Sequence, residues 1–535
     1  MKKIFESSKF KTFFSWFYFR LTTLYSRLPQ NYITSYKYNN SNHTLNCTIC
    51  LAICLFFALT VFCLRAGNNF VDWFDGVWYL ANAKQILTNS LVPRPVPYSE
   101  FTSTIELGTQ YFYTDYGNYL FVLLISFVSH IRGQFSLING MYVAGLFTIL
   151  MSFVMYYFSQ HVLRDRVLAM LVVVGVLIHP LVFDASARPL TETGFLFFFI
   201  LSAWAMMSER PVLAGLALAL GYLYREPGIF YLPFIPFLSP QRLNIKRYIS
   251  ILMIVGFVSM SGPLVRLLIE HFMVPNKHVE NYYDYHMLMT AKKITSLNLE
   301  NLMNFFGHCR NYIKQIGIIP SMVFIITAVK IRHLDKFIVR LCIVSLCVLP
   351  PVLIYHADVA AADPRHFIYA IPFLMLAFAL IVRGFSFRYF FMSCFIVMLC
   401  MMTSYSNNDR KLLNLKALLA DPMDYFACVQ NMADAPIVAL TNMPQKAVLM
   451  VSGRTYFPHL AFIALSDSII VVHAPDFSDF LQGENNHLFD GIVLLREWLG
   501  KEWPNSSIIT DNSGVKFERF SEHRVTIFRR IIMSH

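Results

Sequence analysis

Long uncharged apolar segments constrain this chain more than any other feature of its sequence. Residues 47–64, CTICLAICLFFALTVFCL, contain no charged side chain, and several later segments are similar. Because a helix needs about 20 apolar residues to cross the hydrocarbon layer, these segments predict membrane-spanning helices. The composition agrees, since 56% of the 535 residues are hydrophobic and 14% are charged. The sequence therefore predicts a polytopic α-helical membrane protein.

Eleven segments are predicted to cross the membrane. They are residues 47–64, 137–158, 167–183, 193–207, 211–224, 228–239, 248–270, 317–330, 337–356, 367–382 and 388–404. The apolar stretch 118–130 is too short for an upright crossing, so an interfacial or re-entrant helix is expected there. With the N-terminus in the cytoplasm, arginine-bearing loops such as SPQRLNIKR (239–247) then lie on the cytoplasmic side, as the positive-inside rule requires. This topology puts the C-terminus outside the cytoplasm, and a bacterial inner membrane is the expected location.

The net charge of +12 follows from this topology. Lysines and arginines gather in the N-terminal tail and in short loops between apolar segments, so the charge does not indicate a nucleic-acid partner. Eight of the ten cysteines fall in apolar segments, where thiols behave as small hydrophobic groups. Cys47 and Cys50 have CxxC spacing without a second ligand pair, and a disulfide between Cys309 and Cys428 stays open. No cofactor is predicted; a divalent metal is compatible with the chain but no His/Asp cluster requires one.

The chain is expected to have three parts. A basic cytoplasmic tail covers residues 1–46, and a transmembrane domain covers 47–405 with long extracytoplasmic loops at 65–136 and 271–316. Residues 406–535 are less apolar and predict a small extracytoplasmic α/β domain. Its β-prone runs are residues 436–440, 446–451, 468–472, 491–495 and 524–528.

The first extracytoplasmic loop begins with two acids in the stretch DWFDGVWYLANAKQIL (72–87). A helix starting at Asp75 places Asp75, Tyr79 and Ala83 on one stripe, because residues four apart share a helix face. Asp72 is offset from this stripe and is expected to cap the helix. Asp75 is therefore the candidate for chemistry.

Other charged residues are predicted on the same side of the membrane. Arg188 and Glu192, Arg225 and Glu226, and the run Asp363, Arg365 and His366 all fall at ends of apolar segments. Arginine suits phosphate because its planar fork donates two parallel hydrogen bonds. Each arginine with a neighbouring acid is equally compatible with a structural ion pair. Their gathering on one side favours a polar site.

These motifs, taken in order, resemble the GT-C glycosyltransferases, which include protein O-mannosyltransferases and aminoarabinose transferases. The resemblance runs from the stripe of Asp75, Tyr79 and Ala83 through the region 111–133 and most of residues 45–405. It includes ARPLTETGFLFFFILSAWA (187–205), GYLYREPGIFYLPFIPF (221–237) and DPRHFIYAIPFLML (363–376). His366 departs from the tyrosine common in the family, and TDYGNY before 120 lacks the family's basic residue with proline.

The resemblance implies a membrane-bound enzyme that moves a sugar from a polyprenyl-phosphate donor to an extracytoplasmic acceptor, which the sequence does not identify. It implies that Asp75 is the catalytic base. The substrate-binding residues it implies are Tyr79, Arg188, Glu192, Arg225, Arg365 and His366, with the arginines on the lipid phosphate and no role assigned to Glu192.

Three alternatives stay open. A multi-pass transporter or flippase of lipid-linked saccharide would scatter charged residues through the depth of the bundle. An enzyme that polymerises or ligates surface polysaccharide would share the lipid-linked substrates without this first-loop pattern. A degenerate relative could act as a non-catalytic subunit.

Overall fold

The fold was obtained as a computed structural model of the 535-residue chain. The residues that the structure describes are 40–66, 79–80, 82–84, 86, 96–100, 110–112, 118–133, 136, 138–188, 191–241, 243–273, 303, 306–307, 309–310, 336–350, 364–383, 385–406, 421, 447–451, 470–474, 491–495, 506–522 and 525–531. The chain divides into two units, Met1–Cys50 and Leu51–His535. In the first unit the described residues are the start of one helix. All other described elements belong to the second.

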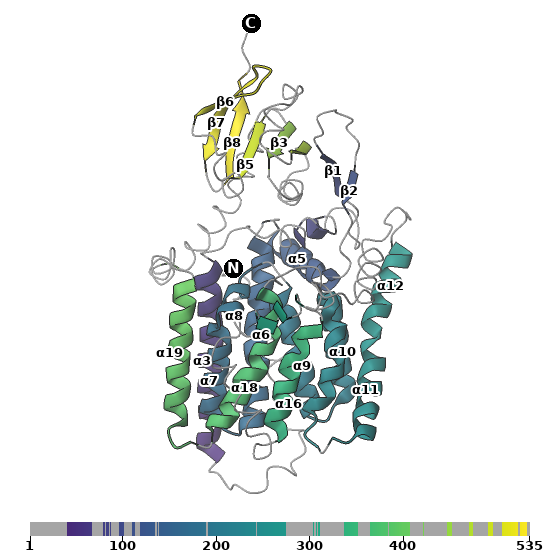
Figure 1. The fold of residues 1–535 in the computed structure, drawn as a ribbon, viewed down its shortest axis with the longest axis vertical. Coiled ribbons are helices and arrows are strands. Elements are labelled where there is room, and N and C mark those ends of the chain that lie inside the picture. Colours follow the sequence, from purple (N-terminus) through teal and green to yellow (C-terminus); the bar gives the residue numbers. More distant parts are fainter. Residues whose placement is uncertain are drawn as a thin grey trace. The chain divides into compact units, whose positions relative to one another are not determined.

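Helices dominate the part of the chain that precedes residue 407 (Figure 1). They are α3 (Asn40–Ala66), α5 (Tyr119–Arg132), α6 (Ile138–Leu163), α7 (Arg166–Ile178), α8 (Pro180–Ala185), α9 (Glu192–Met207), α10 (Pro211–Tyr224), α11 (Ile245–Ser259), α12 (Ser261–Met273), α16 (Lys336–Ser345), α18 (Ile371–Val382) and α19 (Arg388–Ser406), with 3₁₀ helices η3 (Glu226–Leu238), η4 (Leu346–Val348) and η5 (Pro364–Ala370). Among the described residues, four helical segments are long and apolar enough to cross a membrane, and five shorter ones are also apolar. The four are Cys47–Leu64, Ile138–Leu163, Ile245–Ile269 and Arg365–Val382. The described helices thus agree with a multi-pass membrane protein.

Most predicted spans coincide with helices, and prolines explain two differences. The predicted span 167–183 is divided because α7 ends at Ile178 and Pro180 begins α8. Proline cannot donate a backbone hydrogen bond within a helix. The predicted span 228–239 is the 3₁₀ helix η3, which contains Pro233 and Pro236. Residues 317–330 and the end of the predicted span 337–356 lie outside the described residues.

Helix α9 lies in the interior of the helical part of the chain. It packs against α6 and α10 (Figure 1) and against the 3₁₀ helices η3 and η5. Aromatic side chains fill the contacts: the Phe195 ring meets the Tyr369 ring edge-on at 5.0 Å, and the Phe199 ring lies 5.0 Å from the Tyr231 ring. All four side chains are buried. This packing fixes the first turn of α9, where the candidate site lies.

Helix α5 (Tyr119–Arg132) covers the apolar stretch 118–130 that the sequence assigns to an interfacial or re-entrant helix. It ends at Gly133, whose φ of 67° is the left-handed conformation that favours glycine after a helix. Ser126 Oγ donates a hydrogen bond of 2.7 Å to the carbonyl oxygen of Ala83. The helical residues around Ala83 are thereby tied to α5.

A mixed sheet contains the strands β1 (Val96–Glu100), β2 (Gln110–Phe112), β3 (Ala447–Val451), β4 (Ile470–Ala474), β5 (Gly491–Leu495), β6 (Ile508–Thr510), β7 (Lys516–Glu522) and β8 (Val525–Arg530). Their order is β2-β1-β4-β3-β5-β8-β7-β6, with parallel pairing from β1 through β5. Strands β3, β4, β5 and β8 coincide with predicted β-prone runs. The run 436–440 lies outside the described residues, and β6 and β7 were not predicted. Strands β1 and β2 come from the first loop, where no strand was predicted.

Candidate functional site

A buried carboxylate marks the start of α9. Glu192 is the first residue of the helix, and 1% of its surface is exposed. The free N–H groups and the dipole of a first helical turn favour a negative charge at this position. Arg225 Nη1 donates a hydrogen bond of 2.5 Å to Glu192 Oε1 and forms an ion pair with it. Both charges are therefore compensated inside the protein, as buried charges must be.

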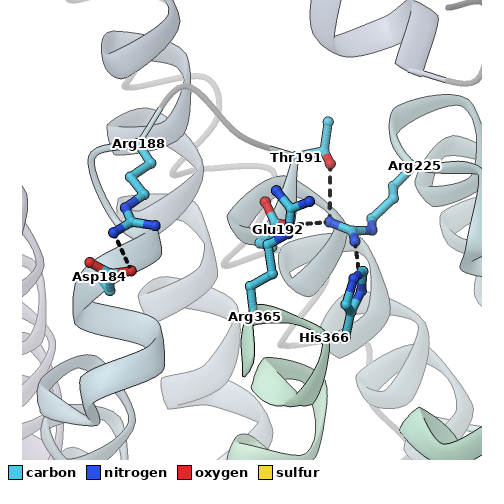
Figure 2. Close-up of polar contacts among 7 residues, drawn as sticks. All are labelled: Asp184, Arg188, Thr191, Glu192, Arg225, Arg365 and His366. Carbon is cyan, nitrogen blue, oxygen red and sulfur yellow. Dashed lines mark hydrogen bonds and ion pairs between the residues drawn. The ribbon is translucent and has the colours of Figure 1, made fainter. Parts of the chain in front are cut away.

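Arg225 is placed by the end of α10. The helix stops at Tyr224, and Arg225 takes an extended backbone with φ −155° and ψ 116° before η3 begins. Its Nη1 also donates to Thr191 Oγ1 at 3.2 Å, so this hydroxyl bonds the guanidinium and does not cap α9. Figure 2 shows the guanidinium between the start of α9 and His366. Arg225 thus joins three separate elements of the fold.

The contact between Arg225 and His366 fixes the protonation of the imidazole. Arg225 Nη2 lies 3.2 Å from His366 Nδ1. An arginine has no acceptor, so Nδ1 must accept this hydrogen bond. A ring whose Nδ1 accepts is neutral and carries its proton on Nε2. His366 therefore adds no charge to the group in this arrangement.

The 3₁₀ helix η5 brings Arg365, His366 and Tyr369 to the same place. Side chains three residues apart line up in a 3₁₀ helix, so His366 and Tyr369 share a side. Both face Arg225, whose guanidinium carbon lies 5.7 Å from the centre of the Tyr369 ring. Arg365 Nε lies 3.7 Å from Glu192 Oε1, and its side chain is 24% exposed. We call Glu192, Arg225, Arg365 and His366 the arginine cluster.

The arginine cluster carries more positive than negative charge. Two guanidinium groups face one carboxylate, and His366 is neutral. Arg225 makes the short contact with the carboxylate, whereas Arg365 stands further from it and is the more exposed of the two. Two guanidinium groups that share one carboxylate attract a further anion. A phosphate group fits the donor geometry that two guanidinium groups can present.

Three oxygen atoms in or beside the arginine cluster have no hydrogen-bond partner among the residues that the structure describes. They are Glu192 Oε2, Tyr224 Oη and Tyr369 Oη. Tyr224 is fully buried and Tyr369 is 1% exposed. Native proteins leave few such groups unsatisfied, and each one suggests an unseen water or ligand.

An aromatic chain connects the first loop to the same place. The Tyr79 ring meets the Phe121 ring edge-on at 5.3 Å, and the Phe121 ring lies 5.2 Å from that of Tyr224. Tyr79 also interacts electrostatically with Arg225. Tyr79 and Ala83, which the sequence places on one stripe, are both buried. The described part of this stripe therefore lies next to the arginine cluster.

Arg188 is not part of the arginine cluster in the contacts that the structure describes. Its Nη2 forms an ion pair of 2.8 Å with Asp184, four residues earlier (Figure 2). The sequence grouped Arg188 with the other arginines because all of them are predicted on the same side of the membrane. In the structure Glu192 pairs with Arg225 instead, 33 residues away.

The proposed base, Asp75, lies outside the described residues, as do Asp72 and the side chain of Glu226. The part of the chain that the structure describes contains no group of three or more His, Cys, Asp or Glu side chains that could hold a metal ion. Sequence reasoning missed Thr191, Tyr224, Tyr369 and Gly194. A signal was present in the sequence, since Tyr224 is next to Arg225 and Tyr369 follows Arg365 by four residues.

Comparison with known proteins gives distant structural similarities. No family model matches the chain, and no curated protein sequence matches it. ArnT from Cupriavidus metallidurans in the apo state is 11% identical, with a TM-score of 0.48 over 91% of this chain and 98% of that chain. The same protein bound to undecaprenyl phosphate gives a TM-score of 0.46 over the same shares. The Archaeoglobus fulgidus oligosaccharyltransferase in complex with Zn and sulfate is 11% identical, with a TM-score of 0.44 over 84% of this chain and 68% of that chain. The proposal below rests on this chain's own residues.

Proposed function

We propose that this chain is a membrane-embedded, inverting glycosyltransferase that moves a sugar from a polyprenyl-phosphate donor to an extracytoplasmic acceptor. The observation that carries the proposal is the arginine cluster at the ends of apolar helices, where the buried Arg225–Glu192 pair and the partly exposed Arg365 together have an excess of positive charge. Buried or intramembrane charges are expensive and mark functional sites. A lipid phosphate would bring the negative charge that the cluster lacks.

The reaction is a single displacement. An acceptor hydroxyl oxygen attacks the anomeric carbon, and the bond from that carbon to the phosphate oxygen breaks with its electron pair on the phosphate. The acceptor proton passes to the Asp75 carboxylate, which acts as general base. Asp75 precedes Tyr79 by four residues, and Tyr79 interacts electrostatically with Arg225. The sequence predicts that Asp75 and Tyr79 share one helix face, which supports placing both on the same substrate.

Arg365 and Arg225 would have different roles toward the leaving phosphate. Charge gathers on the phosphate oxygen as the sugar bond breaks, and preorganised cations stabilise that charge. Arg365, the more exposed and less tightly paired guanidinium, is the direct ligand in this proposal. Glu192 and His366 accept hydrogen bonds from Arg225 and so fix the position of its guanidinium in the proposed phosphate site. This assignment gives Glu192 a positioning role that the sequence left open.

The proposal includes the eleven-span topology. The N-terminal tail is cytoplasmic, and residues 406–535 form an extracytoplasmic domain of a bacterial inner-membrane protein. Fusing a reporter to the C-terminus tests this part, since a cytoplasmic signal would contradict it.

Sugar transfer is tested with purified protein in lipid nanodiscs and radiolabelled polyprenyl-phosphate sugars. Asp75→Asn is expected to lower kcat by about 10²- to 10⁴-fold, the range for loss of a general base. Asp72→Asn is the matched control, and it is expected to keep transfer because Asp72 is assigned to helix capping. Equal transfer by Asp75→Asn and the parent would remove Asp75 from catalysis. Transport of the lipid-linked sugar across the membrane without transfer would favour the flippase.

A further inference from the structure

We propose that Glu192 Oε2, Tyr224 Oη and Tyr369 Oη form a subsite for the hydroxyl groups of the donor sugar, next to the phosphate site of the arginine cluster. This inference rests on the proposed function and specifies which part of the donor each group would contact. We call these three atoms the unpaired polar set.

The unpaired polar set comes from three elements that meet at one place. Glu192 begins α9, Tyr224 ends α10 and Tyr369 lies in η5. Arg225 joins them, because it follows Tyr224 in the chain, pairs with Glu192 and faces the Tyr369 ring. Glu192 interacts electrostatically with both tyrosine hydroxyls.

Gly194 permits this arrangement. A Cβ atom at Gly194 would lie 2.1 Å from Tyr224 Cζ and 2.5 Å from its hydroxyl oxygen. The end of the Tyr224 ring therefore rests on the backbone of α9, two residues after Glu192. On the other side, Phe195 packs edge-on against Tyr369 at 5.0 Å. Both hydroxyls are thus held by packing of their rings and not by hydrogen bonds.

Burial without partners points to a polar occupant. Each of the three residues is at least 99% buried, and within the described structure none of the three atoms has a hydrogen-bond partner. An unsatisfied buried polar atom is costly, and replacing it with carbon would normally stabilise the fold. Three such atoms around one arginine are best explained by a ligand that restores their hydrogen bonds.

The chemistry of the unpaired polar set favours sugar hydroxyls over phosphate. A carboxylate oxygen only accepts hydrogen bonds and repels an anion, whereas a phenol can both donate and accept. A sugar ring offers hydroxyl groups that do both. The anion belongs with Arg365 and Arg225, on the positively charged part of the same group. Phosphate and sugar, joined by one bond in the donor, would then each meet a matching part of the site.

The test compares the binding of two lipids. One is polyprenyl phosphate, and the other is polyprenyl phosphate linked to mannose or to glucose, whichever of the two sugar-linked lipids the parent protein binds more tightly. Tyr224→Phe and Tyr369→Phe each remove one hydroxyl while keeping the ring, so the fold is expected to persist. Tyr231→Phe is the matched control, because its buried ring packs in the same aromatic group. Affinities are measured in nanodiscs, with thermal unfolding as a check on folding.

We expect each of the two variants to bind the sugar-linked lipid about threefold to tenfold more weakly, the usual effect of one lost hydrogen bond. Both variants are expected to bind polyprenyl phosphate as tightly as the parent protein does. Tyr231→Phe is expected to bind both lipids as tightly as the parent protein. Unchanged binding of both lipids by the two variants would mean that the hydroxyls hold only water, and it would overturn the inference. An equal loss for both lipids would overturn it too, by assigning the hydroxyls to the phosphate site. Failure of the parent protein to bind polyprenyl phosphate would instead refute the proposed function.

Discussion

Two arginine–carboxylate pairs lie close together in this sequence and differ in almost every physical respect. Arg188 and Asp184 are four residues apart, and 34% of the Asp184 side chain is exposed. Arg225 and Glu192 are 33 residues apart, come from different helices and are buried. Their N–O distances of 2.8 Å and 2.5 Å are similar, so distance alone does not separate them. The two pairs are separated by their burial and by the charge of neighbouring residues.

The difference shows how a structural ion pair can be distinguished from an ion pair that belongs to a functional site. The Asp184 carboxylate is partly solvated, and water weakens an ion pair with a solvated partner, although only 13% of the Arg188 side chain is exposed. A buried pair loses that solvation and persists only with further hydrogen bonds, which Thr191 and His366 supply here. The buried pair also has a second arginine beside it, and within the described residues its carboxylate keeps one oxygen without a hydrogen-bond partner. Each prediction below tests this contrast.

The largest effect is expected from Glu192→Gln. The change leaves Arg225 buried without a counterion and close to Arg365, and breaking a buried pair costs about 3–5 kcal/mol. Thermal and denaturant unfolding in detergent measure the loss. A loss no larger than that of the matched variant Asp184→Asn would break the contrast.

A paired substitution sharpens the same point. Replacing both partners, as Glu192→Leu with Arg225→Met, removes the buried charges together and is expected to recover most of the lost stability. The double variant is not expected to transfer sugar, because replacing Glu192 and Arg225 disrupts the proposed phosphate site. Recovery of transfer along with stability would show that the pair is only structural.

An intermediate effect is expected from Arg365→Gln. The Arg365 side chain is partly exposed and 3.7 Å from Glu192, so the free energy of unfolding should change by less than about 1 kcal/mol. Affinity for the polyprenyl-phosphate donor should fall by about tenfold to a hundredfold, since hydrogen bonds to charged groups contribute about 1.5–3 kcal/mol. Donor KM is the measurement, with Arg188→Gln for comparison. A larger KM change in Arg188→Gln would reverse the assignment of the two arginines.

The smallest effect is expected from Asp184→Asn. Its partner Arg188 lies one helical turn away, and such pairs contribute about 0.3–0.5 kcal/mol. Unfolding and donor KM should both stay close to those of the parent protein. A destabilisation of more than about 2 kcal/mol would place this pair in the same class as Glu192 and Arg225.

Much of the fold could be predicted from the sequence because apolar length is a local property. The helices α3, α10 and α19 fall where the uncharged segments predict them. The prediction missed the break at Pro180 and the 3₁₀ geometry of η3, although the prolines that cause both are visible in the sequence. Hydropathy does not show how a helix ends. The pairing of β1 with β4 joins segments more than 350 residues apart, and no local pattern could reveal it.

The candidate site was predictable only in part. Arg225, Arg365 and Glu192 were named because charged residues at the ends of apolar segments are unusual. Their pairing depends on how α9, α10 and η5 pack, so the sequence suggested Glu226 or Arg188 as partners where the structure shows Glu192 with Arg225. Tyr224 and Tyr369 were missed because both fall inside predicted spanning segments, 211–224 and 367–382. Their significance depends on burial without a partner, which only coordinates show.

The central claim is that the arginine cluster binds a lipid phosphate, and thermal unfolding with two lipids tests it most directly. Polyprenyl phosphate at a hundredfold excess over its Kd should stabilise the parent protein by about 2.7 kcal/mol, whereas polyprenol, which lacks the phosphate, should not. At the same lipid concentration Arg365→Gln should keep only about 0.4–1.4 kcal/mol of this stabilisation, and Asp184→Asn should keep all of it. Equal stabilisation by the two lipids, or an undiminished effect in Arg365→Gln, would contradict the account.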